Sequence, residues 1–187
     1  MKIFFKNNII NKPIVLIGIM GAGKTTLGKK LAKHLDMEFY DSDEEIESKT
    51  GLSIKIIFKE QGELAFREME EKVVTQLLLG SKRIIATGGG AFINPNLRKI
   101  IKKRAITIWL KTDVDLATIR VKDNKRRPLL NNVDVRETLS VMIEKRNPIY
   151  SEAHVTVESE NIPHNKMISK LLYELETQAA IKIKKQI

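Results

Sequence analysis

The stretch GIMGAGKT, residues 18–25, constrains the fold of this chain more than any other part of its sequence. It follows a continuous apolar run, PIVLIG (13–18), which is typical of a buried β-strand. It precedes KTTLGKKLAKHL (24–35), whose leucines recur at helical spacing. Glycines between a strand and a helix let the backbone wrap an anion, and the helix N-terminus attracts negative charge. The stretch therefore predicts a phosphate-binding turn that opens a parallel α/β sheet.

The lysine and threonine in this turn indicate a nucleotide rather than a purely structural loop. The spacing G-x-x-x-x-G-K-[ST] brings the lysine to the β- and γ-phosphates and the threonine hydroxyl to Mg²⁺. A glycine-rich turn without a ligand needs neither side chain. We expect a nucleoside triphosphate to bind here. The residues expected to contact it are Gly21, Ala22, Gly23, Lys24, Thr25 and Thr26.

Strands and helices are expected to alternate along the rest of the chain. Further strands are expected at EFYD, RIIATGGG, AITIWL and HVTVES. Helices are expected after Ser42, in two pieces over 53–79, from Pro95, from Thr112, over 135–146 and over 163–180. Such alternation predicts a parallel sheet covered by helices on both faces. We therefore predict one domain over 1–187, with its core at about 13–180. Its expected fold is a three-layer α/β/α P-loop NTPase fold with a five-stranded parallel sheet.

Composition excludes several classes of protein. The chain has 187 residues and no cysteine, so a disulfide scaffold, cysteine-ligated zinc and a cysteine nucleophile are excluded. Its longest apolar stretch, residues 13–20, is shorter than the roughly 20 residues that a membrane span needs. The net charge of +10 raises the possibility of nucleic-acid binding, but the lysines are scattered and aromatic residues make up only 5%. We expect a cytoplasmic protein with neither a membrane nor a nucleic-acid partner.

Two carboxylates, Asp41 and Asp43, follow the second expected strand in the stretch FYDSDEE. The carboxyl ends of parallel strands form the edge where ligands bind in such sheets. One of these acids could hold Mg²⁺ or its water, and the other could accept a proton from an attacking hydroxyl. Two solvated acids at a helix start, favoured there by the helix dipole, remain the alternative. In either case Ser42 and Glu45 are expected to form a capping box for the helix that follows.

Three arginines outside the phosphate-binding turn, Arg67, Arg127 and Arg146, could be ordinary surface residues. Arginine is also the side chain that binds a carboxylate through two parallel hydrogen bonds or neutralises a phosphoryl group in transfer. Arg127 lies in the polar stretch KDNKRRPLLNNVD, which has no periodicity and is typical of a mobile lid.

The chain resembles the shikimate kinase family from about residue 13 to residue 175. The resemblance rests on motifs that occur in the family's order and spacing: GIMGAGKTTLGKKLA, DSDEEIE, TGLSIKIIF, GELAFREMEE, TGGGA, RRPLL and KRNPIY. It implies an enzyme that transfers a phosphate from ATP to the 3-hydroxyl of shikimate on the way to the aromatic amino acids. It also implies a monomer, a substrate-binding segment at about 42–79 and a lid at about 122–134.

The resemblance also implies a role for each matching residue. On the nucleotide side, Lys24 and Thr25 serve ATP and Mg²⁺, and Asp41 holds the metal through water. Arg120 packs on adenine, and Arg127 reaches the transferred phosphate. On the acceptor side, Asp43 is the base, and the carboxylate of shikimate is bound by Arg67 and Arg146, with Glu70 orienting Arg67. The ring of shikimate is approached by Gly88, Gly89 and Gly90.

Two other functions stay open at this level. A gluconate-type kinase would share the fold, although the pairing of GGGA with FREMEE is not expected there. A P-loop nucleic-acid-binding ATPase module would account for the positive charge.

Overall fold

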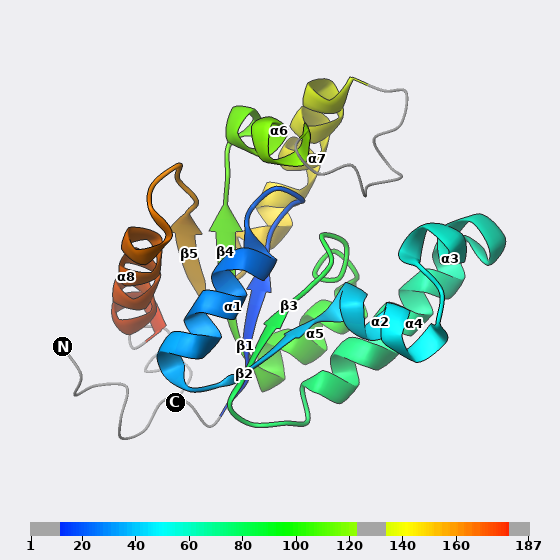
Figure 1. Cartoon of the computed structure of the whole chain (residues 1–187), viewed down its shortest axis with the longest axis horizontal. Helices are drawn as coiled ribbons and strands as arrows, with labels where there is room; N and C mark the ends of the chain where they lie inside the picture. Colours follow the sequence, from blue (N-terminus) through cyan, green and yellow to red (C-terminus); the bar gives the residue numbers. More distant parts are fainter. Residues whose placement is uncertain (1–11, 123–133, 180–187) are drawn as a thin grey trace.

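The computed structural model describes residues 12–122 and 134–179. Its centre is a five-stranded, all-parallel sheet with the strand order β2-β3-β1-β4-β5, which confirms the predicted sheet (Figure 1). The strands are β1 (Ile14–Ile17), β2 (Glu38–Asp41), β3 (Arg83–Ala86), β4 (Ile106–Lys111) and β5 (Val155–Glu158). The central strand β1 is fully buried. It pairs with β3 on one side and β4 on the other, and helices cover both faces of the sheet.

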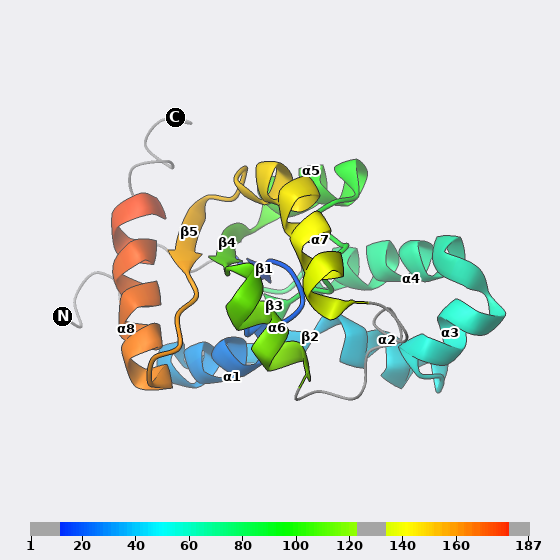
Figure 2. The same ribbon diagram turned by 90° about the horizontal axis from the view of Figure 1, so that it is seen from above.

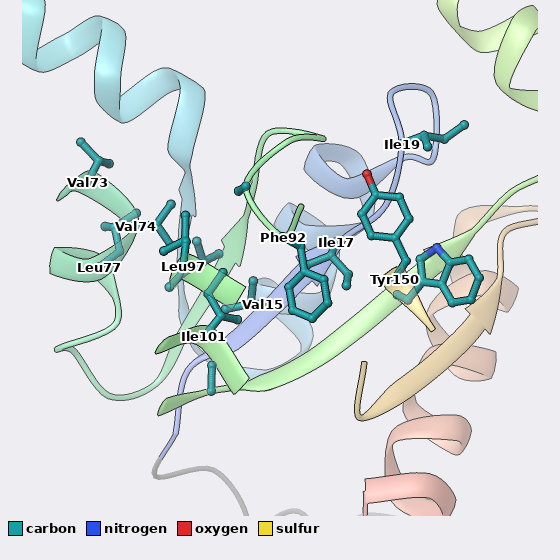
Figure 3. Packing of buried hydrophobic residues seen from close by; sticks show 14 of the residues in the cluster. Val15, Ile17, Ile19, Val73, Val74, Leu77, Phe92, Leu97, Ile101 and Tyr150 are labelled. Atoms are coloured by element: carbon teal, nitrogen blue, oxygen red, sulfur yellow. The ribbon is translucent and has the colours of Figure 1, made fainter. Parts of the chain in front are cut away.

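Two hydrophobic cores cover the two faces of the sheet. Ile14 and Leu16 of β1 pack with α1 (Lys24–Leu35) and α8 (His164–Glu174). Val15 and Ile17 point to the opposite face, since successive side chains alternate along a strand. There they share a core with α4 (Gly62–Leu77), α5 (Pro95–Arg104) and α7 (Val135–Tyr150) (Figures 2 and 3). The arrangement is the predicted three-layer fold.

A helical segment extends beyond the sheet on the side of β2 and β3 (Figure 1). It consists of α2 (Ser42–Thr50), α3 (Ile54–Glu60) and the start of α4. Gly51 ends α2 with φ +69°, and Gly62 separates α3 from α4 with φ +83°. These are left-handed conformations that glycine adopts readily, and the break near Gly62 was expected from the sequence.

The two helices that come before and after residues 123–133 in the sequence differ from the sequence expectation. Helix α6 (Val114–Lys122) is capped by Asp113, whose Oδ1 accepts the backbone N–H of Leu116 at 2.7 Å, and not by Thr112. Helix α7 continues past residue 146, through Pro148, to Tyr150. Pro148 lies near the end of this helix, where its missing N–H affects only the last turn. The extra turn places Tyr150 one turn beyond Arg146.

The closing helix also ends earlier than expected. Helix α8 stops at Glu174, and a π-helical turn, η2 (Leu175–Ala179), follows it. In the described parts of the chain, no helix is both long enough and apolar enough to cross a membrane.

Candidate active site

The turn between β1 and α1 has the backbone shape of a phosphate-binding loop. Gly21 and Gly23 have φ values of +81° and +88°, and Gly23 lies directly before the first residue of α1. A Cβ atom at Gly21 would lie 2.8 Å from the backbone oxygen of Ala117 in α6. Both the conformation and the close approach of α6 therefore require glycine at Gly21.

Two side chains of this loop are held in place by neighbouring groups. The ammonium of Lys24 donates to the backbone oxygens of Gly18 and Ile19, each at 2.9 Å. The hydroxyl of Thr25 donates to Oδ2 of Asp41 at 2.7 Å. The loop and the end of β2 are thus joined directly, as expected for the carboxyl edge of a parallel sheet.

Asp41 also corrects the helix cap expected from the sequence. Its Oδ1 accepts the backbone N–H of Asp43 at 3.0 Å, so Asp41 caps α2 and the expected Ser42–Glu45 capping box is wrong. Asp41 has the extended backbone angles typical of a helix N-cap, whereas Ser42 is already the first residue of α2. The buried Ser42 hydroxyl instead accepts the backbone N–H of Gly88 at 3.0 Å.

The glycine loop after β3, residues 88–90, is the centre of the acceptor side. A Cβ atom at Gly88 would lie 2.9 Å from Oδ1 of Asp43 and 2.8 Å from Oε1 of Glu70. At Gly90 it would collide with the guanidinium of Arg67. Charged side chains from α2 and α4 therefore meet one short stretch of backbone, which only glycine leaves room for.

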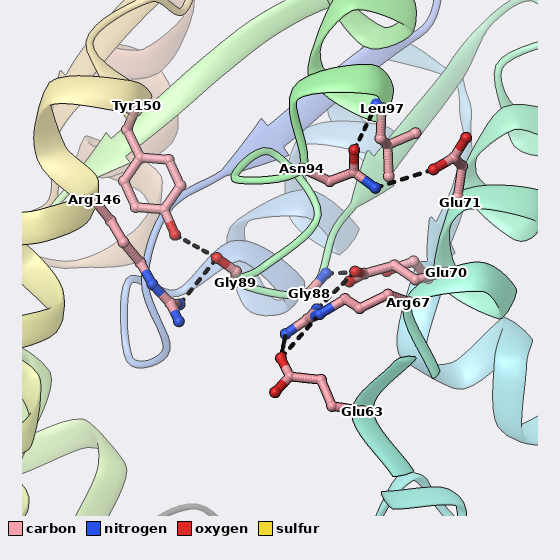
Figure 4. Close-up of polar contacts among 11 residues, drawn as sticks. Glu63, Arg67, Glu70, Glu71, Gly88, Gly89, Asn94, Leu97, Arg146 and Tyr150 are labelled. Carbon is pink, nitrogen blue, oxygen red and sulfur yellow. Dashed lines mark hydrogen bonds and ion pairs between the residues drawn. The ribbon is translucent and has the colours of Figure 1, made fainter. Parts of the chain in front are cut away.

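Arg67 is held by two carboxylates of its own helix (Figure 4). Its Nη1 lies 2.7 Å from Oε2 of Glu70, three residues later, and its Nη2 lies 3.1 Å from Oε1 of Glu63, four residues earlier. The Glu70 contact is the orientation expected from the sequence. Only 1% of the Glu70 side chain is exposed, and its Oε1 has no hydrogen-bond partner among the described residues. Burial raises the pKa of Glu70, although the guanidinium of Arg67 opposes this.

Arg146 approaches the same glycine loop from α7. Its Nη1 donates to the backbone oxygen of Gly89 at 3.1 Å, and the hydroxyl of Tyr150 donates to the same oxygen at 2.5 Å (Figure 4). Burial raises the pKa of Tyr150 to about 12, so its hydroxyl carries its proton at neutral pH. Sequence reasoning missed Tyr150. Its i,i+4 spacing from Arg146 was the available signal, but the expected helix stopped at residue 146.

A cavity of about 440 Å³ adjoins the phosphate-binding loop. Its lining includes Gly23, Thr26, Arg120 and residues that follow β5. The guanidinium of Arg120 donates to the backbone oxygens of Gly21 and Glu160 and to the Ser159 hydroxyl, at 3.2, 2.9 and 2.8 Å. Arg120 therefore connects α6 to both walls of this cavity. Ser159, which also donates to the Ala22 oxygen at 3.1 Å, was not expected from the sequence.

Most of the expected site residues lie within one region at the carboxyl edge of the sheet. The residues that follow β1, β2 and β3 are in contact, and Arg67 and Arg146 reach the loop after β3 from opposite helices (Figure 4). Arg127 and residues 123–133 of the expected lid lie outside the described residues.

Comparison with models of protein families assigns the chain to a family. Residues 20–176 match the family model described as shikimate kinase. The chain belongs to the shikimate kinase family. A shikimate kinase of Rhodopseudomonas palustris is 42% identical over 165 residues, which cover 88% of this chain and 81% of that protein.

Comparison with solved structures agrees with this assignment. A shikimate kinase from Acinetobacter baumannii, in complex with shikimate, matches with a TM-score of 0.85 and 40% identity. The match covers 89% of this chain and 93% of that chain. A gluconokinase from Sinorhizobium meliloti matches with a TM-score of 0.61 but only 15% identity, over 96% of this chain and 100% of that chain. The second likeness shows the fold alone, so it does not favour the gluconate alternative.

Proposed function

We propose that this chain transfers the γ-phosphate of ATP to the 3-hydroxyl of shikimate, giving ADP and shikimate 3-phosphate. The observation that carries the proposal is the loop of residues 88–90. It is contacted by a carboxylate, Asp43, and by two arginines, Arg67 and Arg146, next to the phosphate-binding loop. This combination suits an acceptor with one carboxylate and several hydroxyl groups. The two arginines would bind the carboxylate, and Asp43 would bind the reacting hydroxyl.

The nucleotide half supports ATP as the phosphate donor. The positive-φ glycines and the start of α1 have the form of an anion site, and the ammonium of Lys24 is held at the beginning of the same loop by the oxygens of Gly18 and Ile19. The cavity beside this loop lies between α1, Arg120 and the residues after β5, which is where we place the nucleoside. We propose that the described residues that contact ATP are Gly21, Ala22, Gly23, Lys24, Thr25, Thr26 and Arg120.

Thr25, at the start of α1, and Asp41, at the end of β2, fit a magnesium ion. Mg²⁺ prefers oxygen ligands and usually takes only one or two from the protein. Because Thr25 donates its hydroxyl proton to Asp41, the lone pairs of the Thr25 oxygen stay available to a cation. We propose that Thr25 binds Mg²⁺ directly and that Asp41 binds it through water. When bound, the ion would neutralise charge on the β- and γ-phosphates.

In the proposed reaction, the 3-hydroxyl oxygen attacks the γ-phosphorus while the bond to the leaving ADP oxygen breaks. Asp43 accepts the hydroxyl proton, and Lys24 stabilises charge on the phosphates. We also propose that Arg127, which lies outside the described residues, contacts the transferred phosphate. The whole chain would act as a single kinase domain, with acceptor binding at about 42–79 and a lid at about 122–134.

A substrate screen tests this function. Purified protein with Mg·ATP is mixed with shikimate, with gluconate, with single-stranded DNA or RNA, or with no acceptor, and ADP release is followed. Of these mixtures, we expect only the one with shikimate to release ADP. Mass spectrometry should find an equal amount of phosphorylated shikimate. Turnover of gluconate, or ATP hydrolysis stimulated only by nucleic acid, would contradict the proposal.

We further propose that the chain acts as a monomer in the cytoplasm, without a membrane or nucleic-acid partner. The scattered lysines support a solvated surface rather than a binding stripe. Sedimentation at micromolar concentration and a filter-binding assay with DNA and RNA check the oligomeric state and the nucleic-acid partner.

A further inference from the structure

The backbone oxygen of Gly89 accepts two hydrogen bonds, and both donors come from α7. Tyr150 donates through its hydroxyl and Arg146 through Nη1 (Figure 4). A carbonyl oxygen has two lone pairs, so these donors satisfy it completely. The other end of the glycine loop is anchored separately, by the hydrogen bond from the Gly88 N–H to Ser42.

The two donors differ in how firmly they are held. Only 1% of Tyr150 is exposed, and Figure 3 shows its ring within the hydrophobic cluster. The ring packs against Trp109 of β4, with 6.1 Å between the ring centroids. Its hydroxyl can therefore turn to few other acceptors. Arg146 is half-buried, and its guanidinium carries further N–H groups besides the one that binds Gly89.

This difference matters for catalysis if Arg146 binds the carboxylate of the acceptor, so the role inferred for Tyr150 rests on the proposed function. A two-bonded arginine–carboxylate contact needs a defined orientation of the guanidinium. A guanidinium that turns towards a substrate carboxylate weakens its own bond to the Gly89 oxygen, which accepts from Nη1 at 3.1 Å. Without a second donor, the Gly89 oxygen would then lose its only partner, which is unfavourable inside a protein.

We propose that Tyr150 is a positioning residue for the acceptor. It keeps the Gly89 oxygen satisfied and the glycine loop in place, so that Arg146 can turn to the substrate carboxylate at low cost. Tyr150 itself touches no reacting atom. Its position one helical turn beyond Arg146 depends on α7 continuing through Pro148.

The substitution Tyr150→Phe tests the proposal, because it removes the hydroxyl and keeps the ring against Trp109. We expect the KM for shikimate to rise about five- to tenfold, in line with the loss of one hydrogen bond. The KM for ATP should stay within about twofold, and circular dichroism should show a folded protein. Tyr173→Phe, which alters a 63% exposed tyrosine on α8, is the matched control and should change neither constant.

A double-mutant comparison separates this role from a general effect on packing. In an Arg146→Ala background, Tyr150→Phe should raise the shikimate KM by less than about twofold, because the residue through which it acts is gone. An equal rise in both backgrounds would overturn the proposal. So would an unchanged shikimate KM in the single variant, or equal rises in both KM values.

The same measurements distinguish failure of this inference from failure of the proposed function. If the unmodified protein does not phosphorylate shikimate, both fail. If it does so and Tyr150→Phe leaves the shikimate KM unchanged, only the role of Tyr150 fails.

Discussion

The nucleotide side and the acceptor side of the site are built in different ways. The phosphate-binding loop is one continuous segment whose shape depends on backbone angles at Gly21 and Gly23. The acceptor side is assembled from charged side chains of α2, α4 and α7 around residues 88–90. A site made of backbone tolerates few substitutions at its glycines, whereas a site made of side chains can lose one contact at a time. Substitutions of loop glycines should therefore impair ATP binding as a whole, whereas substitutions on the acceptor side should each remove one contact with the acceptor.

The largest effect is expected at Asp43. In Asp43→Asn, the side chain keeps its size but cannot accept the hydroxyl proton, so kcat should fall by about 10²- to 10⁴-fold. ATP affinity, measured by calorimetry, should hardly change, because the nucleotide side is intact. Asp115→Asn removes an exposed carboxylate that pairs with Arg136 and is the matched control. Near-normal turnover of Asp43→Asn would rule out its assignment as the base.

Alanine variants of the two arginines on the acceptor side should bind shikimate about equally weakly but should differ in thermal stability. Arg67→Ala and Arg146→Ala should each raise the shikimate KM by about 10- to 100-fold, the effect of losing a charged hydrogen-bond partner. Only Arg67→Ala should also lower Tm clearly, because it leaves the buried Glu70 without its cation. Thermal unfolding of both variants checks this. Equal Tm losses in the two variants would contradict a specific stabilising role of the Arg67–Glu70 pair.

On the nucleotide side, Gly21→Ala should weaken ATP binding about tenfold. The substitution forces a non-glycine residue to φ +81° and brings its Cβ to within 2.8 Å of the Ala117 oxygen. Gly51→Ala provides the control, since Gly51 has φ +69° with no atom within 4 Å of the added Cβ. It shares the backbone strain but not the collision, so it should cost some stability and leave ATP binding unchanged. Similar ATP affinities in both variants would contradict the role of the close approach.

The smallest effect is expected for Glu70→Gln, and it depends on pH. Because burial raises the pKa of Glu70 in the folded protein, the wild-type fold loses stability as pH rises from the unfolded-state pKa through the folded-state pKa. The amide does not ionise, so the stability of Glu70→Gln relative to wild type should increase as pH rises from about 4.5, the ordinary pKa of a glutamate, towards neutral. Urea unfolding across this range measures the difference. Glu63→Gln alters a side chain that is 67% exposed and is the control. Its free energy of unfolding should depend on pH in the same way as that of the wild type.

Much of the fold was predictable because its signals are local. Helix α1 and strand β2 have the predicted bounds, and Asn94 and Pro95 start α5 as expected. Their signals are helical spacing, capping residues and short apolar runs, which neighbouring residues decide. The caps at Ser42 and Thr112 were wrong because in each case an adjacent aspartate accepts the backbone N–H near the start of the helix instead.

The sequence by itself determined the phosphate-binding loop, the order of strands and helices and the residues able to serve a phosphate transfer. These follow from patterns within a few consecutive residues. Only the tertiary structure decided which of those residues meet. It placed Ser42 against Gly88, and it extended α7 so that Tyr150 and Arg146 converge on Gly89. Such contacts join elements far apart in the chain, and the packing of helices on a common sheet edge creates them.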